Sequence, residues 1–143
     1  MLSNSMIVTV LPAVDLDRAR DFYENKLGFR MLMKDNYKGL TFQAGQNTMF
    51  YIYQRSQTKA THTVAEFVVE NLDAEVSNMK SKGIKFLEYD IPEMGIKTVN
   101  GIAQMGDSKG AWFNDTEGNI IALGEWSPTV KNTLKEKQMA FSR

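Results

Sequence analysis

The sequence contains no cysteine and only one histidine, His62. The absence of cysteine excludes disulfides, thiolate catalysis and cysteine-based zinc sites. A divalent-metal site needs three or four His, Asp or Glu donors that meet at about 2.0–2.2 Å. With a single histidine and no evident acidic companions, the sequence predicts neither a bound metal nor another cofactor.

The sequence also lacks an excess of either charge, because Lys+Arg and Asp+Glu number 17 each. Without a basic excess to neutralise phosphates, nucleic-acid binding is disfavoured. A neutral chain lacks the long-range field that keeps copies apart, which is compatible with self-association. No apolar run approaches the length needed to span a bilayer, and the N-terminus lacks a basic segment before its apolar residues. We therefore expect a cytoplasmic protein that has no membrane partner.

The first half of the chain predicts the order strand, helix, strand, strand, strand. Asp15 is a suitable N-cap for the helix, and Gly28 a suitable residue just after its end. Between them Leu16, Ala19, Tyr23 and Leu27 recur at helical spacing. The predicted strands cover residues 6–11, 29–34, 40–44 and 48–54.

The second half repeats this order about fifty-five residues later. Asn71 can cap the second helix, and Gly83 follows it as Gly28 follows the first. The predicted strands cover residues 62–69, 84–89, part of 96–105, 111–114 and 119–123. An extra segment at 90–107 either forms part of a binding rim or is simply a longer hairpin. In the tail, Ser127 before Pro128 predicts another helix.

Two stretches carry a resemblance to a known family. Residues 13–29, AVDLDRARDFYENKLGF, and residues 113–125, FNDTEGNIIALGE, resemble the opening and closing motifs of the glyoxalase/bleomycin-resistance/extradiol dioxygenase (vicinal oxygen chelate) superfamily. Thr116 and Glu117 stand where the closing motif has Pro and Asp. The resemblance implies an α+β fold of two βαβββ modules, each a half-barrel cup. We expect the modules at 6–55 and 61–125, within a domain at 1–126, and a helical tail at 127–143.

In that superfamily the first and last strands of each module supply the metal ligands. The resemblance assigns these four positions to Val8, Tyr51, Val64 and Ala122, none of which is an ordinary metal ligand. A shift of two residues along one strand would instead select His62 or Glu66. That would still provide only one donor.

The same assignment implies the lining of the cup, because alternate residues of a strand share one face. This lining is apolar and aromatic, which suits a flat or apolar organic ligand. A closed hydrophobic core is the alternative interpretation. The predicted ligand-binding residues are Val8, Val10, Met49, Tyr51, Tyr53, Val64, Glu66, Trp112, Ile120 and Ala122.

Three functions remain open. The first is a metal-independent protein that binds a small organic molecule. The second is a glyoxalase-like lyase or isomerase with Glu66 or Tyr51 as the catalytic acid or base. The third is an interaction protein whose cup is filled. Because the superfamily commonly pairs its chains, we expect a homodimer.

Overall fold

The computed structural model describes residues 1–141, with side chains through residue 138. The chain divides into two compact units. The first unit comprises Met1–Ala65 and Asn114–Ile120, and the second comprises Glu66–Phe113 and the chain from Ile121 onward. The turn at 114–120, which lies within the second repeat in sequence, is thus part of the first unit.

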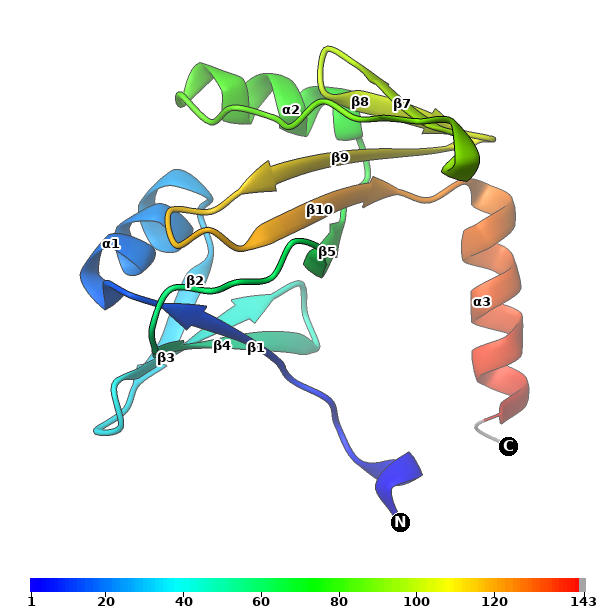
Figure 1. The fold of residues 1–143 in the computed structure, drawn as a ribbon. Coiled ribbons are helices and arrows are strands. Elements are labelled where there is room, and N and C mark those ends of the chain that lie inside the picture. Colours follow the sequence, from blue (N-terminus) through cyan, green and yellow to red (C-terminus); the bar gives the residue numbers. More distant parts are fainter. Residues whose placement is uncertain (142–143) are drawn as a thin grey trace. The chain divides into compact units, whose positions relative to one another are not determined.

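The first unit is built on a four-stranded sheet in the order β1-β4-β3-β2 (Figure 1). Strand β1 runs parallel to β4, and the other neighbours are antiparallel. A short 3₁₀ turn, η1, precedes the sheet, and helix α1 continues directly into a π-helical turn, η2. The elements are η1 (Leu2–Asn4), β1 (Thr9–Ala13), α1 (Leu16–Arg20), η2 (Asp21–Lys26), β2 (Arg30–Lys34), β3 (Gly39–Ala44) and β4 (Thr48–Gln54).

Helix α1 and η2 pack on one face of this sheet. Asp15 caps the helix as predicted, and its side chain accepts a hydrogen bond from the backbone N–H of Arg18. From η2, the buried ring of Tyr23 lies 6.0 Å from Phe42 and 5.4 Å from Phe50, measured between centroids. Because strand residues alternate between faces, Val10, Tyr51 and their alternate neighbours belong to the opposite face.

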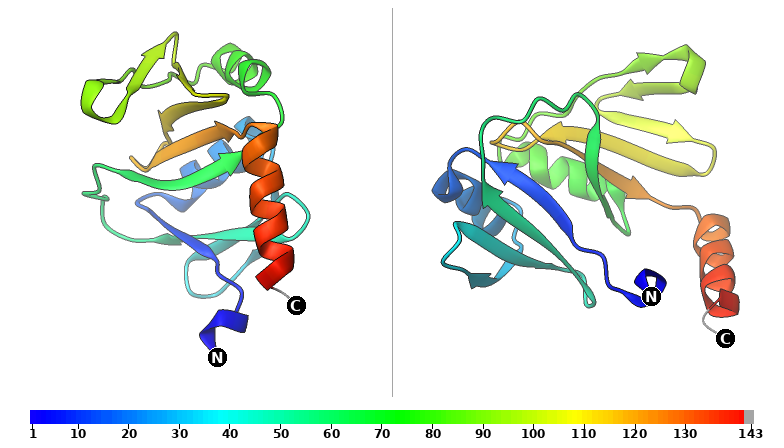
Figure 2. Two further views of the ribbon diagram at one scale, coloured as in Figure 1. Left: turned by 90° about the vertical axis from the view of Figure 1, so that its right-hand side faces the viewer. Right: turned by 60° about the horizontal axis from the view of Figure 1, so that its bottom comes forward.

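The second unit repeats this plan on a six-stranded sheet in the order β5-β10-β9-β8-β7-β6. Asn71 caps α2, whose Leu72, Val76 and Met79 are buried. The second view in Figure 2 shows the hairpin of β7 and β8, in yellow-green, beyond β9 at one edge of the sheet. The elements are β5 (Thr63–Val68), α2 (Leu72–Ser81), β6 (Asp90–Ile91), η3 (Pro92–Met94), β7 (Ile96–Val99), β8 (Ile102–Met105), β9 (Ser108–Asn114), β10 (Ile120–Glu125) and α3 (Pro128–Phe141).

The doubled α+β fold predicted from the repeat is therefore confirmed. Two predicted strands are wrong in detail. The first strand begins at Thr9, so residues 6–8 precede it. Residues 84–89 form an irregular segment with one isolated bridge, between Phe86 and Phe113.

The segment at 84–89 is irregular because its backbone hydrogen bonds are shared between two neighbouring strands. The N–H of Leu87 donates to the carbonyl of Trp112 in β9, whereas the carbonyl of Tyr89 accepts from the N–H of Thr98 in β7. A regular strand needs consecutive partners on one neighbour, and this segment turns from one neighbour to another.

The extra segment at 90–107 supplies β6, η3 and the β7–β8 hairpin. The turn of that hairpin is Asn100–Gly101, with φ angles of 54° and 85°. Positive φ at both central residues is typical of a tight two-residue hairpin turn.

The tail forms α3, with the Ser127 hydroxyl accepting a hydrogen bond from the N–H of Val130. None of the helices in the described part of the chain is long and apolar enough to cross a membrane.

Candidate functional site

The face of the first sheet opposite α1 carries the aromatic residues that the sequence selected. In the sheet register Val10 pairs with Tyr51, and Tyr51 pairs with Thr41 of β3. Met49 and Tyr53 lie two residues before and after Tyr51, so they share its side of β4. The intervening Phe50 and Ile52 are buried toward the helix. Four predicted lining residues, Val10, Met49, Tyr51 and Tyr53, therefore lie on one face.

Tyr51 is fixed in place on this face. Its hydroxyl donates a hydrogen bond of 2.6 Å to Oδ2 of Asp35, which lies in the connection between β2 and β3. Oδ1 of Asp35 accepts from the backbone N–H groups of Tyr37, at 2.7 Å, and Gly39, at 3.1 Å. A Cβ atom added at Gly39 would overlap the Tyr51 hydroxyl, so the glycine makes room for the ring to lie across β3.

This hydrogen bond also sets the protonation of both partners. The bond to Asp35 raises the pKa of Tyr51, and burial and the nearby carboxylate charge raise it further. The same bond, together with the two backbone N–H groups, lowers the pKa of Asp35. Tyr51 therefore keeps its proton near neutral pH. That favours a binding surface over a catalytic base at this position.

Tyr53 extends the aromatic surface. The rings of Tyr51 and Tyr53 lie with centroids 6.1 Å apart and planes at 18°, a parallel, offset arrangement. The guanidinium carbon of Arg55 lies 5.8 Å from the Tyr53 ring centroid, within the range of a cation–π interaction. We call Tyr51, Tyr53, Asp35 and Arg55 the tyrosine platform. The sequence did not select Asp35, Gly39 or Arg55.

In the second unit, Glu66 lies across β10. A Cβ atom added at Gly124 would be 2.8 Å from the Glu66 carboxylate and 3.4 Å from the indole nitrogen of Trp126. Alternation puts Gly124 on the same side of β10 as Ala122, which is buried. Glu66 itself is exposed, so the residue is not enclosed in an apolar cavity.

Trp112, in β9, also lies against a glycine, Gly110 of the same strand. A Cβ atom added at Gly110 would be 2.6 Å from the Met105 methyl group and 3.3 Å from the Trp112 ring. Trp112 also meets the Tyr89 ring edge to face, at 5.4 Å between centroids. The remaining predicted lining residues, Val8, Val64 and Ile120, are each half-buried. We predicted from the sequence that ten residues line one cup. In the structure these ten residues are divided between the two units.

The residues at the superfamily's metal positions do not fit a metal ion. Val8, Val64 and Ala122 have no donor atom in their side chains, and Tyr51 is hydrogen bonded to Asp35. In residues 1–141, the structure brings no three His, Asp or Glu side chains together in a way that could hold a metal. His62, the single histidine, is exposed.

A buried polar cluster fixes the 114–120 turn within the first unit. The Glu117 carboxylate accepts hydrogen bonds from the backbone N–H groups of Val14 (2.9 Å) and Asp15 (3.0 Å) and from Nε of Arg18 (2.8 Å). Burial acts to raise the pKa of Glu117, but the hydrogen bonds from Arg18, Asp15 and Thr116 outweigh it and lower the pKa from 4.5 to about 2.

The neighbouring carboxylate of this cluster, Asp115, accepts from the hydroxyl of Tyr23 at 2.6 Å. Burial and the Asp115 carboxylate raise the pKa of Tyr23 well above its ordinary value, so this phenol stays neutral. The cluster therefore holds the end of β1 and the start of α1 beside the turn, and its charges are satisfied internally.

Comparison with known proteins supports the fold. The sequence profile of the Glyoxalase/Bleomycin resistance protein/Dioxygenase superfamily matches residues 6–123. No curated protein matches the chain in sequence.

Several solved structures share its architecture. TnmS3, an antibiotic binding protein from Streptomyces sp. CB03234, is 18% identical with a TM-score of 0.65, over 87% of this chain and 98% of that one. Lactoylglutathione lyase from Agrobacterium tumefaciens is 20% identical with a TM-score of 0.63, over 85% and 93%. The fosfomycin resistance protein FosX from Mesorhizobium loti is 12% identical with a TM-score of 0.62, over 90% and 97%. At these identities the likeness concerns the fold alone.

Proposed function

The chain belongs to the Glyoxalase/Bleomycin resistance protein/Dioxygenase superfamily, and we propose that it binds a small, planar aromatic molecule without using a metal ion. The observation that carries this proposal is the tyrosine platform. Two nearly parallel rings lie on the sheet face opposite α1, one of them held by Asp35. Rings that are fixed before binding lose little conformational entropy when a ligand stacks on them.

The surroundings of the platform suit such a ligand. Val10 and Met33 flank Tyr51 and Thr41 in the sheet register, and they are 53% and 56% exposed. Large apolar side chains this exposed give a ligand apolar area to cover. Met33 is also flexible enough to fit irregular shapes. Arg55, beside Tyr53, would favour an anionic substituent on the ring system.

Two related proteins support binding as the function. TnmS3 is an antibiotic binding protein and FosX is a fosfomycin resistance protein, so this fold serves proteins that bind or counteract antibiotics. A lyase or isomerase that uses Tyr51 as its base has less support, because the pKa of Tyr51 is raised and its proton is held by Asp35.

Two further aspects are proposals as well. We propose that the chain forms a homodimer, because exposed apolar residues outside the tyrosine platform, such as Met6 and Ile7, are available for association and the net charge is zero. A cytoplasmic location stays a prediction from the sequence.

A fluorescence titration tests the proposed function. The probes are anthraquinone-2-sulfonate and naphthalene-2-sulfonate, with cyclohexanesulfonate as a control that has the same charge but no aromatic ring. We expect the aromatic probes to bind and the control to bind much more weakly. Replacing Tyr53 with Leu should weaken the aromatic probes about fivefold, the effect expected of losing one stacking partner.

The matched control variant is Tyr37→Leu, which removes a tyrosine that is 86% exposed and outside the platform. This variant should bind the probes as the unmodified protein does. Equal binding of aromatic and cyclohexane probes, or equal affinity after Tyr53→Leu, would contradict the proposal.

A further inference from the structure

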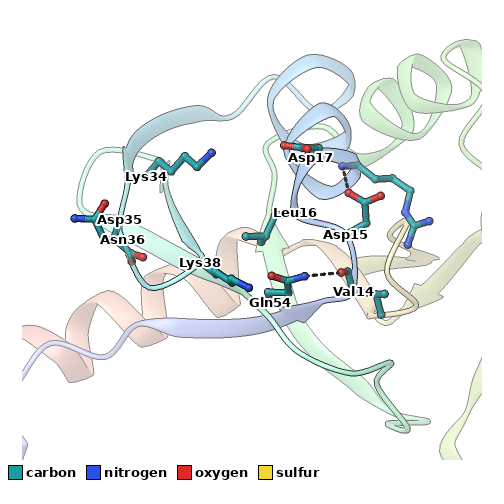
Figure 3. Close-up of a pocket in the computed structure, with 10 residues that line it drawn as sticks. Val14, Asp15, Leu16, Asp17, Lys34, Asp35, Asn36, Lys38 and Gln54 are labelled. Atoms are coloured by element: carbon teal, nitrogen blue, oxygen red, sulfur yellow. Dashed lines mark hydrogen bonds between the residues drawn. The ribbon is translucent and has the colours of Figure 1, made fainter.

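The first unit contains a pocket of about 630 Å³ that is separate from the tyrosine rings. It lies between the chain at residues 14–18, where β1 leads into α1, and the connection from β2 to β3 at residues 34–38 (Figure 3). Gln54, at the end of β4, completes the lining. This volume lies within the range of about 300–1,000 Å³ typical of small-molecule sites.

Several charged groups of the pocket already have partners. Arg18 pairs with Glu117 at 2.8 Å, and Asp15 accepts from the backbone N–H of Arg18 at 3.0 Å. Asp35 is hydrogen bonded to Tyr51. These groups line the pocket, but they are not available to neutralise the charge of a ligand.

Three charged side chains of the pocket have no partner of this kind. Within the described residues, Lys34, Lys38 and Asp17 form no ion pair or side-chain hydrogen bond. Figure 3 shows Lys34 extending from the β2–β3 side toward Asp17 in the first turn of α1, whereas Lys38 extends toward Gln54. Two unpaired ammonium groups and one unpaired carboxylate thus line one pocket, with a net charge of one positive unit among them.

We propose that this pocket binds a small zwitterion that carries a dianionic phosphate or phosphonate and one ammonium group. The dianion would lie in the pocket with Lys34 and Lys38 as its two cationic partners, since ammonium groups bind phosphoryl oxygens. The ammonium group would face Asp17, and Leu16 would contact the carbon atoms between the two charges. Such a ligand has one net negative charge, which complements the unpaired charges of the pocket.

Nuclear magnetic resonance titrations at low ionic strength test this proposal with two probes. O-phosphoethanolamine carries both charged groups, and inorganic phosphate lacks the ammonium group. We expect the amide signals of residues 14–18 and 34–38 to shift with both probes. O-phosphoethanolamine should bind more tightly, by about two- to fivefold, the usual worth of one exposed charge pair.

Three variants identify the groups involved. Asp17→Asn should abolish the preference for O-phosphoethanolamine over phosphate, since it removes the partner of the ammonium group. The double variant Lys34→Gln, Lys38→Gln should weaken both probes by about fivefold or more. Lys59→Gln is the control, because it removes an exposed lysine outside this pocket and should change neither affinity.

The proposal is overturned if both probes bind the unmodified protein equally, if neither binds at millimolar concentration, or if the double variant binds as tightly as the unmodified protein. The Tyr53→Leu variant distinguishes binding at this pocket from binding at the tyrosine platform. It should leave O-phosphoethanolamine binding unchanged, so either site can fail while the other stands.

Discussion

The Tyr51 hydroxyl donates a 2.6 Å hydrogen bond to the Asp35 carboxylate, and this contact joins the last strand of the first module to the connection between β2 and β3. It fixes the ring that the superfamily resemblance places at a former metal position. It also holds a proton where a metal ligand would need a free lone pair.

This bond predicts how Tyr51 titrates. Replacing Asp35 with Asn removes the charge that favours the neutral phenol, so the pKa of Tyr51 should fall toward its ordinary value near 10. Ultraviolet titration of phenolate absorbance measures this, with Tyr51→Phe as the reference that identifies the Tyr51 signal. An unchanged titration curve in Asp35→Asn would show that the two side chains do not interact.

Gly39 should be essential to the tyrosine platform. Replacing it with Ala puts a Cβ atom where the Tyr51 hydroxyl lies, so the ring must move and the bond to Asp35 must break. We expect a loss of about 1–3 kcal/mol in the free energy of unfolding, as for other over-packed sites. Urea denaturation measures the loss, and aromatic-probe binding should weaken with it. A Gly39→Ala variant that keeps full stability and binding would mean that Tyr51 lies elsewhere.

Glu117 should make the first unit sensitive to acid. Its pKa in the folded protein is about 2, below the value of 4.5 for an unperturbed carboxyl, so its stabilisation is complete above pH 4.5. The stabilisation is lost as the pH falls from 4.5 toward 2, and it amounts to on the order of 3 kcal/mol. Urea unfolding across this range should show a smaller pH dependence for Glu117→Gln than for the unmodified protein. Identical slopes would contradict the assignment.

Glu66 should contribute little to stability and nothing to binding at the tyrosine platform. Because its side chain is exposed, Glu66→Gln should change the free energy of unfolding by less than about 0.5 kcal/mol. The tyrosine platform belongs to the first unit and Glu66 to the second, so the same variant should leave the affinity for the charged aromatic probes unchanged. Thermal denaturation and fluorescence titration measure the two effects. A changed affinity would show that Glu66 takes part in binding these probes.

The protein should bind no stoichiometric divalent metal. Elemental analysis of protein exposed to zinc, nickel and iron should give far less than one equivalent per chain, because the donors at the four superfamily positions are missing. A stoichiometric metal would overturn this assignment.

Sedimentation at micromolar concentration should show a dimer. A monomer alone would contradict the proposed association.

Much of the fold follows from local patterns in the sequence. Asp15 and Asn71 cap their helices as predicted, because capping depends on residues within one turn. The alternation of Tyr51 and Tyr53 with buried Ile52 follows from the period of two in a strand.

The features that the sequence did not predict depend on contacts between residues that are distant in sequence. The bond from Tyr51 to Asp35 requires the register between β3 and β4, which turn residues alone do not reveal. Asp35, at the start of the connection between β2 and β3, predicts a turn but not the side chain that it binds. Likewise, nothing local to the turn at 114–120 indicates that Glu117 binds the backbone of Val14.

The most direct test of the proposed function is a nuclear Overhauser measurement on the protein saturated with anthraquinone-2-sulfonate. If the tyrosine platform is the binding surface, the aromatic protons of the probe will show contacts to the rings of Tyr51 and Tyr53 and to the methyl groups of Val10. Contacts confined to other residues, or no contacts at saturation, would contradict the proposal that this face of the sheet binds a planar aromatic ligand.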